Sequence, residues 1–164
     1  MAHVPKNPAI AMREGVSPSC LALPRVRQSP WATLIDHLVK RLPRITREEW
    51  TARMRSGGVL GEDGQPLPPD APYLGGSRVY YWRELPSETP IPFEAQVLFE
   101  DAHLVVADKP HFLPVTPGGR YVRETLLVRL KAQLGLPDLS PLHRIDRETA
   151  GLVLLSKQIG RAHV

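Results

Sequence analysis

Apolar residues recur at helical spacing in the first half of the chain. Between residues 31 and 42 they return every three or four positions, which is the spacing of one face of an α-helix. Pro43 is expected to end this helix. Thr46 and Glu49 form a capping-box pair, so the sequence predicts a second helix that begins there and buries Trp50.

Shorter apolar runs, separated by turn residues, predict strands in the remainder of the chain. A hairpin is expected over residues 59–67, around an Asp-Gly turn, and a strand over residues 79–85. The second half adds strands over 97–100, 103–108, 142–145 and 152–155, and a helix over 122–134. The predicted fold class is therefore α+β, with a small helical and hairpin module followed by a mainly antiparallel sheet with a flanking helix.

Proline-rich segments divide these elements into domains. Residues 1–30 carry scattered prolines and little periodicity, so they are predicted to form an extended arm. The first compact module is expected over residues 31–85. Prolines and a serine crowd residues 86–95, which are predicted to be a linker, and a second domain follows over residues 96–158.

Composition excludes several classes of protein. The 164 residues contain no run of 18 apolar residues, and the start of the chain lacks the continuous apolar stretch of a secretory signal. The single cysteine, Cys20, cannot form an internal disulfide, and zinc-ligand spacing is absent. We therefore expect a cytoplasmic protein without a metal or a membrane partner.

Basic residues are concentrated on the predicted helical pair. The whole chain has a formal charge of +4, and residues 25–55 alone hold eight basic and three acidic residues. Such an excess can face RNA phosphates or simply form a solvated helix surface. The candidate RNA-binding residues are Arg44, Arg47, Arg53 and Arg55.

A polar turn between two apolar segments is the most informative part of the sequence. Residues 142–152 read Leu-His-Arg-Ile-Asp-Arg-Glu-Thr-Ala-Gly-Leu, and Asp146 lies between the cations Arg144 and Arg147. An ionised carboxylate beside arginines can act as a nucleophile or a base. The alternative from the residues alone is a surface turn whose charges neutralise one another.

Two other enzyme classes use similar residues. A protein kinase needs a contiguous His-Arg-Asp triplet and a later asparagine, but Ile145 interrupts the triplet and position 151 is glycine. A glycosidase could use Asp146 and Glu148 as its carboxylate pair, although nothing else in the sequence supports that chemistry.

The polar turn resembles the catalytic motif of RluA-type pseudouridine synthases, His-Arg-Leu-Asp-Arg-x-Thr-Ser-Gly-Leu. This chain departs from it at Ile145 and Ala150. The upstream segments VLFEDAHLVVADKP and HFLPVTPGG are also similar to that family, so the resemblance covers residues 96–157. Residues 31–85 resemble a small S-four-like RNA-binding module.

The resemblance implies an α+β pseudouridine synthase sheet and an RNA partner, either rRNA or tRNA. It assigns Asp146 as the catalytic carboxylate and Arg144 as the cation that fills the space left by a flipped base. In a strand, residues two apart share a face, so Arg144 and Asp146 could meet one substrate while Arg147 contacts phosphate or backbone. No cofactor is implied because the product is an isomer of the substrate, and a monomer is expected.

The family's active-site tyrosine and a basic residue lie downstream of the motif, whereas every tyrosine here lies upstream. We therefore expect an inactive fragment of a longer enzyme. Residues 159–164 are predicted to be an artefactual tail, because ATC GGA AGA GCA CAC GTC, a common sequencing adapter, encodes them. The alternative function is a non-catalytic RNA-binding protein that retains the motif as scaffold.

Overall fold

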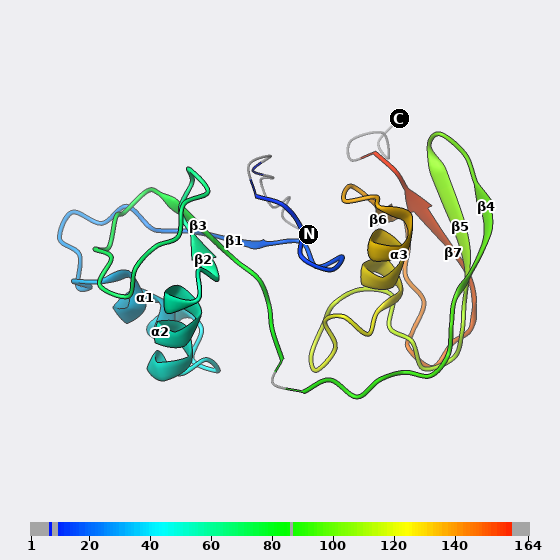
Figure 1. The fold of residues 1–164 in the computed structure, drawn as a ribbon, viewed down its shortest axis with the longest axis horizontal. Helices are drawn as coiled ribbons and strands as arrows, with labels where there is room; N and C mark the ends of the chain where they lie inside the picture. Colours follow the sequence, from blue (N-terminus) through cyan, green and yellow to red (C-terminus); the bar gives the residue numbers. More distant parts are fainter. Residues whose placement is uncertain (1–6, 8–9, 86, 159–164) are drawn as a thin grey trace. The chain divides into compact units, whose positions relative to one another are not determined.

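The computed structural model describes residue 7 and residues 10–85 and 87–158. The predicted tail, 159–164, lies outside the described residues. The chain divides into a first unit, which runs to Ala11 and resumes over Pro18–Trp82, and a second unit, which comprises Met12–Ser17 and the chain from Arg83 onward. Both units contain an antiparallel sheet and helical structure, so the α+β prediction is confirmed (Figure 1).

The sheet of the first unit contains three short strands in the order β1-β3-β2. The central strand β3 (Arg78–Tyr81) pairs antiparallel with β1 (Ser19–Ala22) on one side and β2 (Val59–Leu60) on the other. The sequence predicted β2 and β3. The structure adds β1, which lies within the segment expected to be an extended arm.

Two helices pack against this sheet, and both begin at complete capping boxes. Thr33 caps α1 (Leu34–Arg41), and Thr46 caps α2 (Arg47–Arg55). Each threonine hydroxyl accepts the amide of the third helical residue, whose carboxylate accepts the threonine amide in return. The helices bury a core with the sheet that includes Leu34, Leu38, Trp50, Met54, Val59 and Val79.

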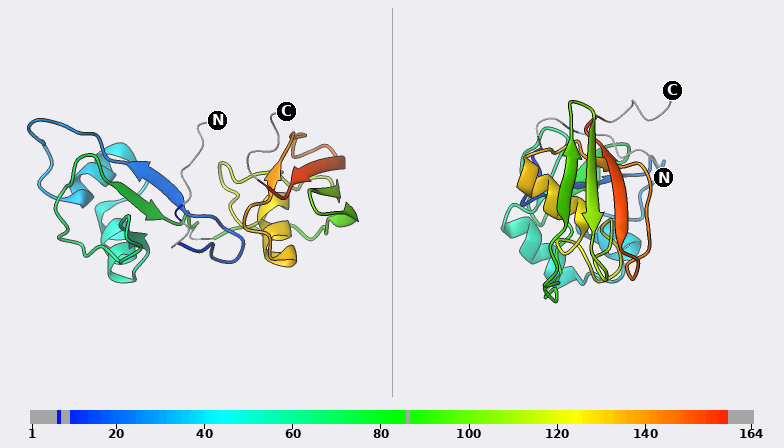
Figure 2. Two further views of the ribbon diagram at one scale, coloured as in Figure 1. Left: turned by 90° about the horizontal axis from the view of Figure 1, so that it is seen from above. Right: turned by 90° about the vertical axis from the view of Figure 1, so that its right-hand side faces the viewer.

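The sheet of the second unit has the order β4-β5-β7-β6, and all its pairings are antiparallel. The strands are β4 (Gln96–Glu100), β5 (Leu104–Lys109), β6 (Ser140–Pro141) and β7 (Gly151–Ser156). Helix α3 (Leu126–Leu134), capped by Thr125, lies along one face of the sheet (Figures 1 and 2). Its apolar residues form the core with Val105, Ala107, Val153 and Leu155.

The segment predicted as a linker is bound to the second unit. The Glu88 carboxylate accepts three backbone amides, those of Val122, Arg123 and Glu124, at 2.6 to 3.0 Å. Farther along, Arg129 donates to the carbonyls of Ile91 and Phe93. From Glu88 to Phe93 the chain is therefore fixed by polar contacts with the residues at the start of α3.

Candidate active site

The polar turn leaves the sheet earlier than the sequence predicted. Residues 142–145 were expected to form a strand, but β6 ends at Pro141. The Leu142 amide still donates to the Leu154 carbonyl, whereas the Leu154 amide donates to the His143 ring nitrogen Nε2 at 3.2 Å. The imidazole thus replaces the backbone carbonyl that would have continued the pairing. The prediction for residues 142–145 is wrong, and strand parity does not place Arg144 and Asp146.

An open hollow nevertheless brings the three predicted site residues together. It has a volume of about 560 Å³ and is lined by Arg144, Ile145, Asp146 and Arg147 on one side. The loop that follows β5 supplies the other lining residues, Pro114, Val115 and Thr116. The Arg144 and Asp146 side chains are exposed, so a ligand can reach both the carboxylate and a guanidinium.

Arg147 is engaged within the protein. Its Nη1 donates to the Tyr121 hydroxyl at 2.8 Å, and its Nε donates to the Glu148 carboxylate at 2.9 Å. These two bonds raise the pKa of Arg147, and the Arg147 bond lowers the pKa of Glu148. The guanidinium also lies over the Tyr121 ring, 5.7 Å from its centroid. These contacts orient Arg147 beside the hollow and occupy two of its donors.

Lys109 joins the turn to the core. It is the third residue of β5 that faces inward, after Val105 and Ala107, and it is fully buried. Its ammonium donates to the carbonyls of Pro110 at 2.9 Å, Leu113 at 2.8 Å and Arg147 at 3.2 Å. Burial lowers the pKa of Lys109, while the charge of Glu148 opposes this shift. One ammonium therefore links both loops that line the hollow.

A second bond connects the same two loops. The His111 ring nitrogen Nδ1 lies 2.7 Å from the Glu148 carbonyl, which can only accept, so Nδ1 carries the proton. Sequence reasoning missed Lys109, His111 and Tyr121. In a strand every second residue faces the same side, so Lys109 shares the core face of β5 with Val105 and Ala107. This spacing was the sequence signal from which the burial of Lys109 could have been predicted.

The four candidate RNA-binding arginines of the first unit differ in their surroundings. Arg47 donates to Asp36 at 2.7 Å and joins α2 to α1. That bond is the main reason that the pKa of Asp36 is lowered to about 2. Arg53 lies over the Trp50 ring, 5.4 Å from its centroid. The Arg44 and Arg55 side chains are exposed.

The comparisons with known proteins cover the segment that contains the turn. Residues 103–161, which include the turn, match the model of the family described as RNA pseudouridylate synthase. The chain belongs to the RluA-type pseudouridine synthase family. An uncharacterised RNA pseudouridine synthase of Synechocystis is 36% identical to this chain over 129 residues, which cover 78% of this chain and 44% of the relative.

Two further relatives carry names that state their RNA. The ribosomal large subunit pseudouridine synthase D of Neisseria meningitidis serogroup B is 32% identical over 74% of this chain and 34% of the relative. The mitochondrial tRNA pseudouridine(32) synthase of Saccharomyces cerevisiae is 44% identical over 38% of this chain and 13% of the relative. The chain thus spans less than half the length of these pseudouridine synthases.

The described residues contain neither a metal-ligand cluster nor a membrane-spanning helix. Within 7, 10–85 and 87–158, no three His, Cys, Asp or Glu side chains lie together in a way that could hold a metal ion. No helix in the same part of the chain is long and apolar enough to cross a bilayer.

Proposed function

We propose that the chain contributes the catalytic aspartate of an enzyme that converts uridine to pseudouridine in rRNA or tRNA. The observation that carries this proposal is that Asp146 and Arg144 line one open hollow, within the segment that matches the family. The names of the Neisseria and yeast relatives favour rRNA or tRNA as the substrate.

The reaction detaches uracil from its ribose, rotates the base and joins it again through a carbon–carbon bond. Asp146 attacks the sugar near its anomeric carbon or removes a proton there, and both tasks require the ionised carboxylate. The product is an isomer, so the overall reaction consumes no oxidant or reductant. Lys109 and His111 hold the turn, and thereby the Asp146 backbone, in position.

The target uridine has to leave its stack to reach the hollow. Base flipping costs roughly a few kcal/mol. Arg144 is exposed at the hollow, and its planar guanidinium can stack where the uracil was and offset part of that cost. Arg147, held by Tyr121 and Glu148, retains donor capacity for a phosphate beside the flipped nucleotide.

We also propose that the first unit binds RNA through the basic surface of α1, α2 and their junction. The exposed Arg44 and Arg55 side chains are best placed to contact phosphates. Arg47 and Arg53 would share that role with the contacts they make to Asp36 and Trp50. This surface would raise affinity without selecting a base.

The decisive experiment measures pseudouridine formation in an rRNA or tRNA transcript. It uses the 164-residue chain and a chimaera in which this chain replaces the matched segment of the Synechocystis relative, because the chain spans 44% of that protein. Asp146→Asn should abolish activity while RNA affinity is retained. Asp108→Asn, an exposed aspartate at the end of β5, is the matched control. Equal activity of the parent and Asp146→Asn would overturn the proposal.

A non-catalytic RNA-binding protein is the second candidate function. It is favoured by the exposure of Asp146, since a catalytic carboxylate works best in a water-excluded site. RNA binding without any pseudouridine formation by either protein would select this function. Arg144→Ala separates the two further, because a base-flipping residue affects turnover more than affinity.

A further inference from the structure

Two phenylalanine rings of the second unit lie together at the surface. Phe93, just before β4, and Phe112, just after β5, are 45% and 49% exposed, and their ring centroids are 6.3 Å apart. The His111 ring lies 6.0 Å from that of Phe112. We call Phe93, His111 and Phe112 the aromatic surface. Large apolar rings that remain exposed side by side are typical of a binding site.

The backbone under the aromatic surface is held firmly. Arg129 donates to the Phe93 carbonyl at 2.7 Å. On the other side, Lys109 bonds the carbonyls that flank His111 and Phe112, those of Pro110 and Leu113, and His111 bonds the Glu148 carbonyl. The backbone that carries the rings therefore has little freedom to lose when a ligand binds.

Phe112 also occupies an unfavourable backbone conformation. Its φ is +65°, in the left-handed region that suits glycine and costs free energy for a bulky side chain. The partial burial of this ring is therefore offset by the cost of its backbone conformation. Strained residues of this kind concentrate at functional sites.

The loop that carries His111 and Phe112 continues into the hollow. Pro114, two residues after Phe112, lines the hollow with Asp146 and Arg144. Unpaired RNA bases stack on aromatic rings, and nearby arginines attract the phosphates between them. Extrusion of a uridine also exposes the faces of its neighbours in the strand.

We propose that the aromatic surface stacks an unpaired nucleobase next to the target uridine, with Phe112 as its central ring. This inference rests on the proposed function. It makes Phe112 a residue that positions the RNA strand and selects targets in unpaired segments. The Asp146 carboxylate performs the chemistry, and the aromatic surface supplies binding.

The test is Phe112→Gly in the 164-residue chain, with a fluorescein-labelled single-stranded oligouridine as the probe. Glycine removes the ring and suits the positive φ, so thermal stability should rise or stay unchanged. Without this ring one base of the probe can no longer stack on the protein, so the Kd of the probe should rise about tenfold. Phe112→Trp should retain affinity, and a probe with 2-aminopurine in place of one uracil should report stacking in the parent but not in Phe112→Gly.

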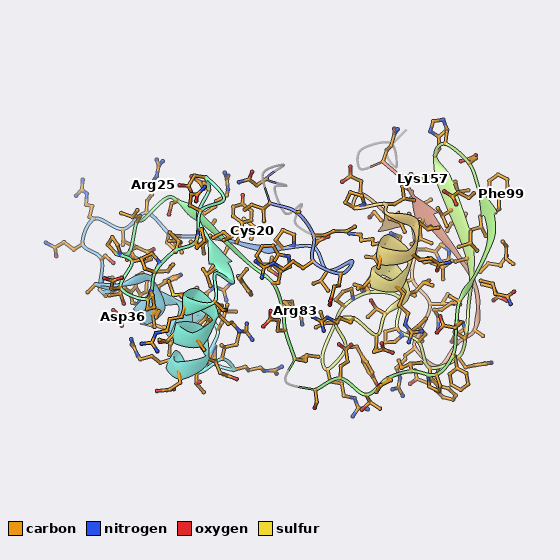
Figure 3. The ribbon with its side chains drawn as sticks, viewed as in Figure 1. Cys20, Arg25, Asp36, Arg83, Phe99 and Lys157 are labelled. Atoms are coloured by element: carbon orange, nitrogen blue, oxygen red, sulfur yellow. The ribbon has the colours of Figure 1, made fainter. Side chains whose placement is uncertain are left out.

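The matched control is Phe99→Ala. Phe99 is 52% exposed in the same unit and lies on β4, which forms a hairpin with β5 (Figure 3). Its removal should leave the Kd unchanged. An unchanged Kd for Phe112→Gly, or an equal loss for Phe99→Ala, would overturn the inference. Either outcome leaves the proposed function standing, because that function fails only through the pseudouridine assay with Asp146→Asn.

Discussion

Replacing Lys109 by methionine is expected to destabilise the second unit by about 3 kcal/mol. Methionine fills nearly the same volume in this fully buried position but donates no hydrogen bond. The carbonyls of Pro110, Leu113 and Arg147 would each lose a charged donor. An orphaned buried acceptor costs roughly 1–3 kcal/mol, and the removed ammonium offsets part of that sum because burial disfavours its charge.

The distribution of aromatic residues allows the two units to be followed separately. Trp31, Trp50 and Trp82 all lie in the first unit, so tryptophan fluorescence reports its unfolding and serves as an internal reference. Hydrogen exchange by mass spectrometry reports the second unit. In Lys109→Met the core amides of β5 and β7 should exchange about a hundredfold faster, which corresponds to about 3 kcal/mol.

Lys157→Met provides the matched lysine control. Lys157, labelled in Figure 3, lies in the same unit and pairs with Glu100 at 2.6 Å, but the glutamate side chain is 40% exposed. Its loss should cost less than about 1 kcal/mol. If Lys109→Met changed exchange as little as Lys157→Met, the three bonds of Lys109 would merely balance the cost of burying its charge. Lys109 would then not be what holds the turn in place.

Three further predictions concern the cores and the caps. His37 is buried against the rings of Trp31 and Tyr73, and this burial, aided by the charge of Arg41, lowers the pKa of His37. Below about pH 6.5 the unfolded chain therefore binds a proton that the folded chain does not. The free energy of unfolding of the first unit should then fall by at most about 1.4 kcal/mol per pH unit. His37→Phe should flatten this dependence in tryptophan-monitored urea titrations, and an unchanged slope would contradict it. Thr46→Ala should destabilise the first unit by about 1 kcal/mol through loss of the α2 cap. Thr51→Ala is the control, because Thr51 lies in the middle of the helix and its hydroxyl bonds only a carbonyl of the preceding turn, that of Arg47; equal midpoints for the two variants would exclude the cap. Glu88→Gln should speed exchange of the amides of residues 122–124, whereas Glu94→Gln, 87% exposed at its side chain, should leave them unchanged.

Local patterns predicted the elements whose contacts are also local. The capping box predicted at Thr46 needs only four consecutive residues, and α2 begins where Thr46 and Glu49 required. The similar box at Thr33 is equally local, but it was not predicted. Strands β5 and β7 are short apolar runs and were predicted within a residue or two of their observed ends. The catalytic motif was likewise contiguous, so a short stretch of sequence was enough to identify Asp146 as the candidate.

The features that were missed depend on partners distant in the sequence. Strand β1 is recognisable only through its pairing with β3, for which Cys20 lies opposite Tyr80. Glu88 lies in a proline-rich segment, and its role depends on amides more than 30 residues later. Residues 142–145 had a strand-like pattern, but the His143 ring took the bond that a strand would have needed. The spacing of apolar residues along the sequence carries no information about these long-range bonds.

The loops that form the hollow around Asp146 are fixed by bonds to their backbone carbonyls, outside the lining of the hollow. Lys109 and His111 bond the carbonyls of Arg147 and Glu148, which leaves the faces of Asp146 and Arg144 open toward solvent. The backbone next to Asp146 is fixed in this way, and no ion pair within the described residues occupies the Asp146 carboxylate. Its remaining requirement is exclusion of water, and a stacked RNA strand over Phe112 and Phe93 would meet that requirement at the moment of binding. Substrate binding and activation of the carboxylate would then be one event, because the same RNA that supplies the uridine covers the site.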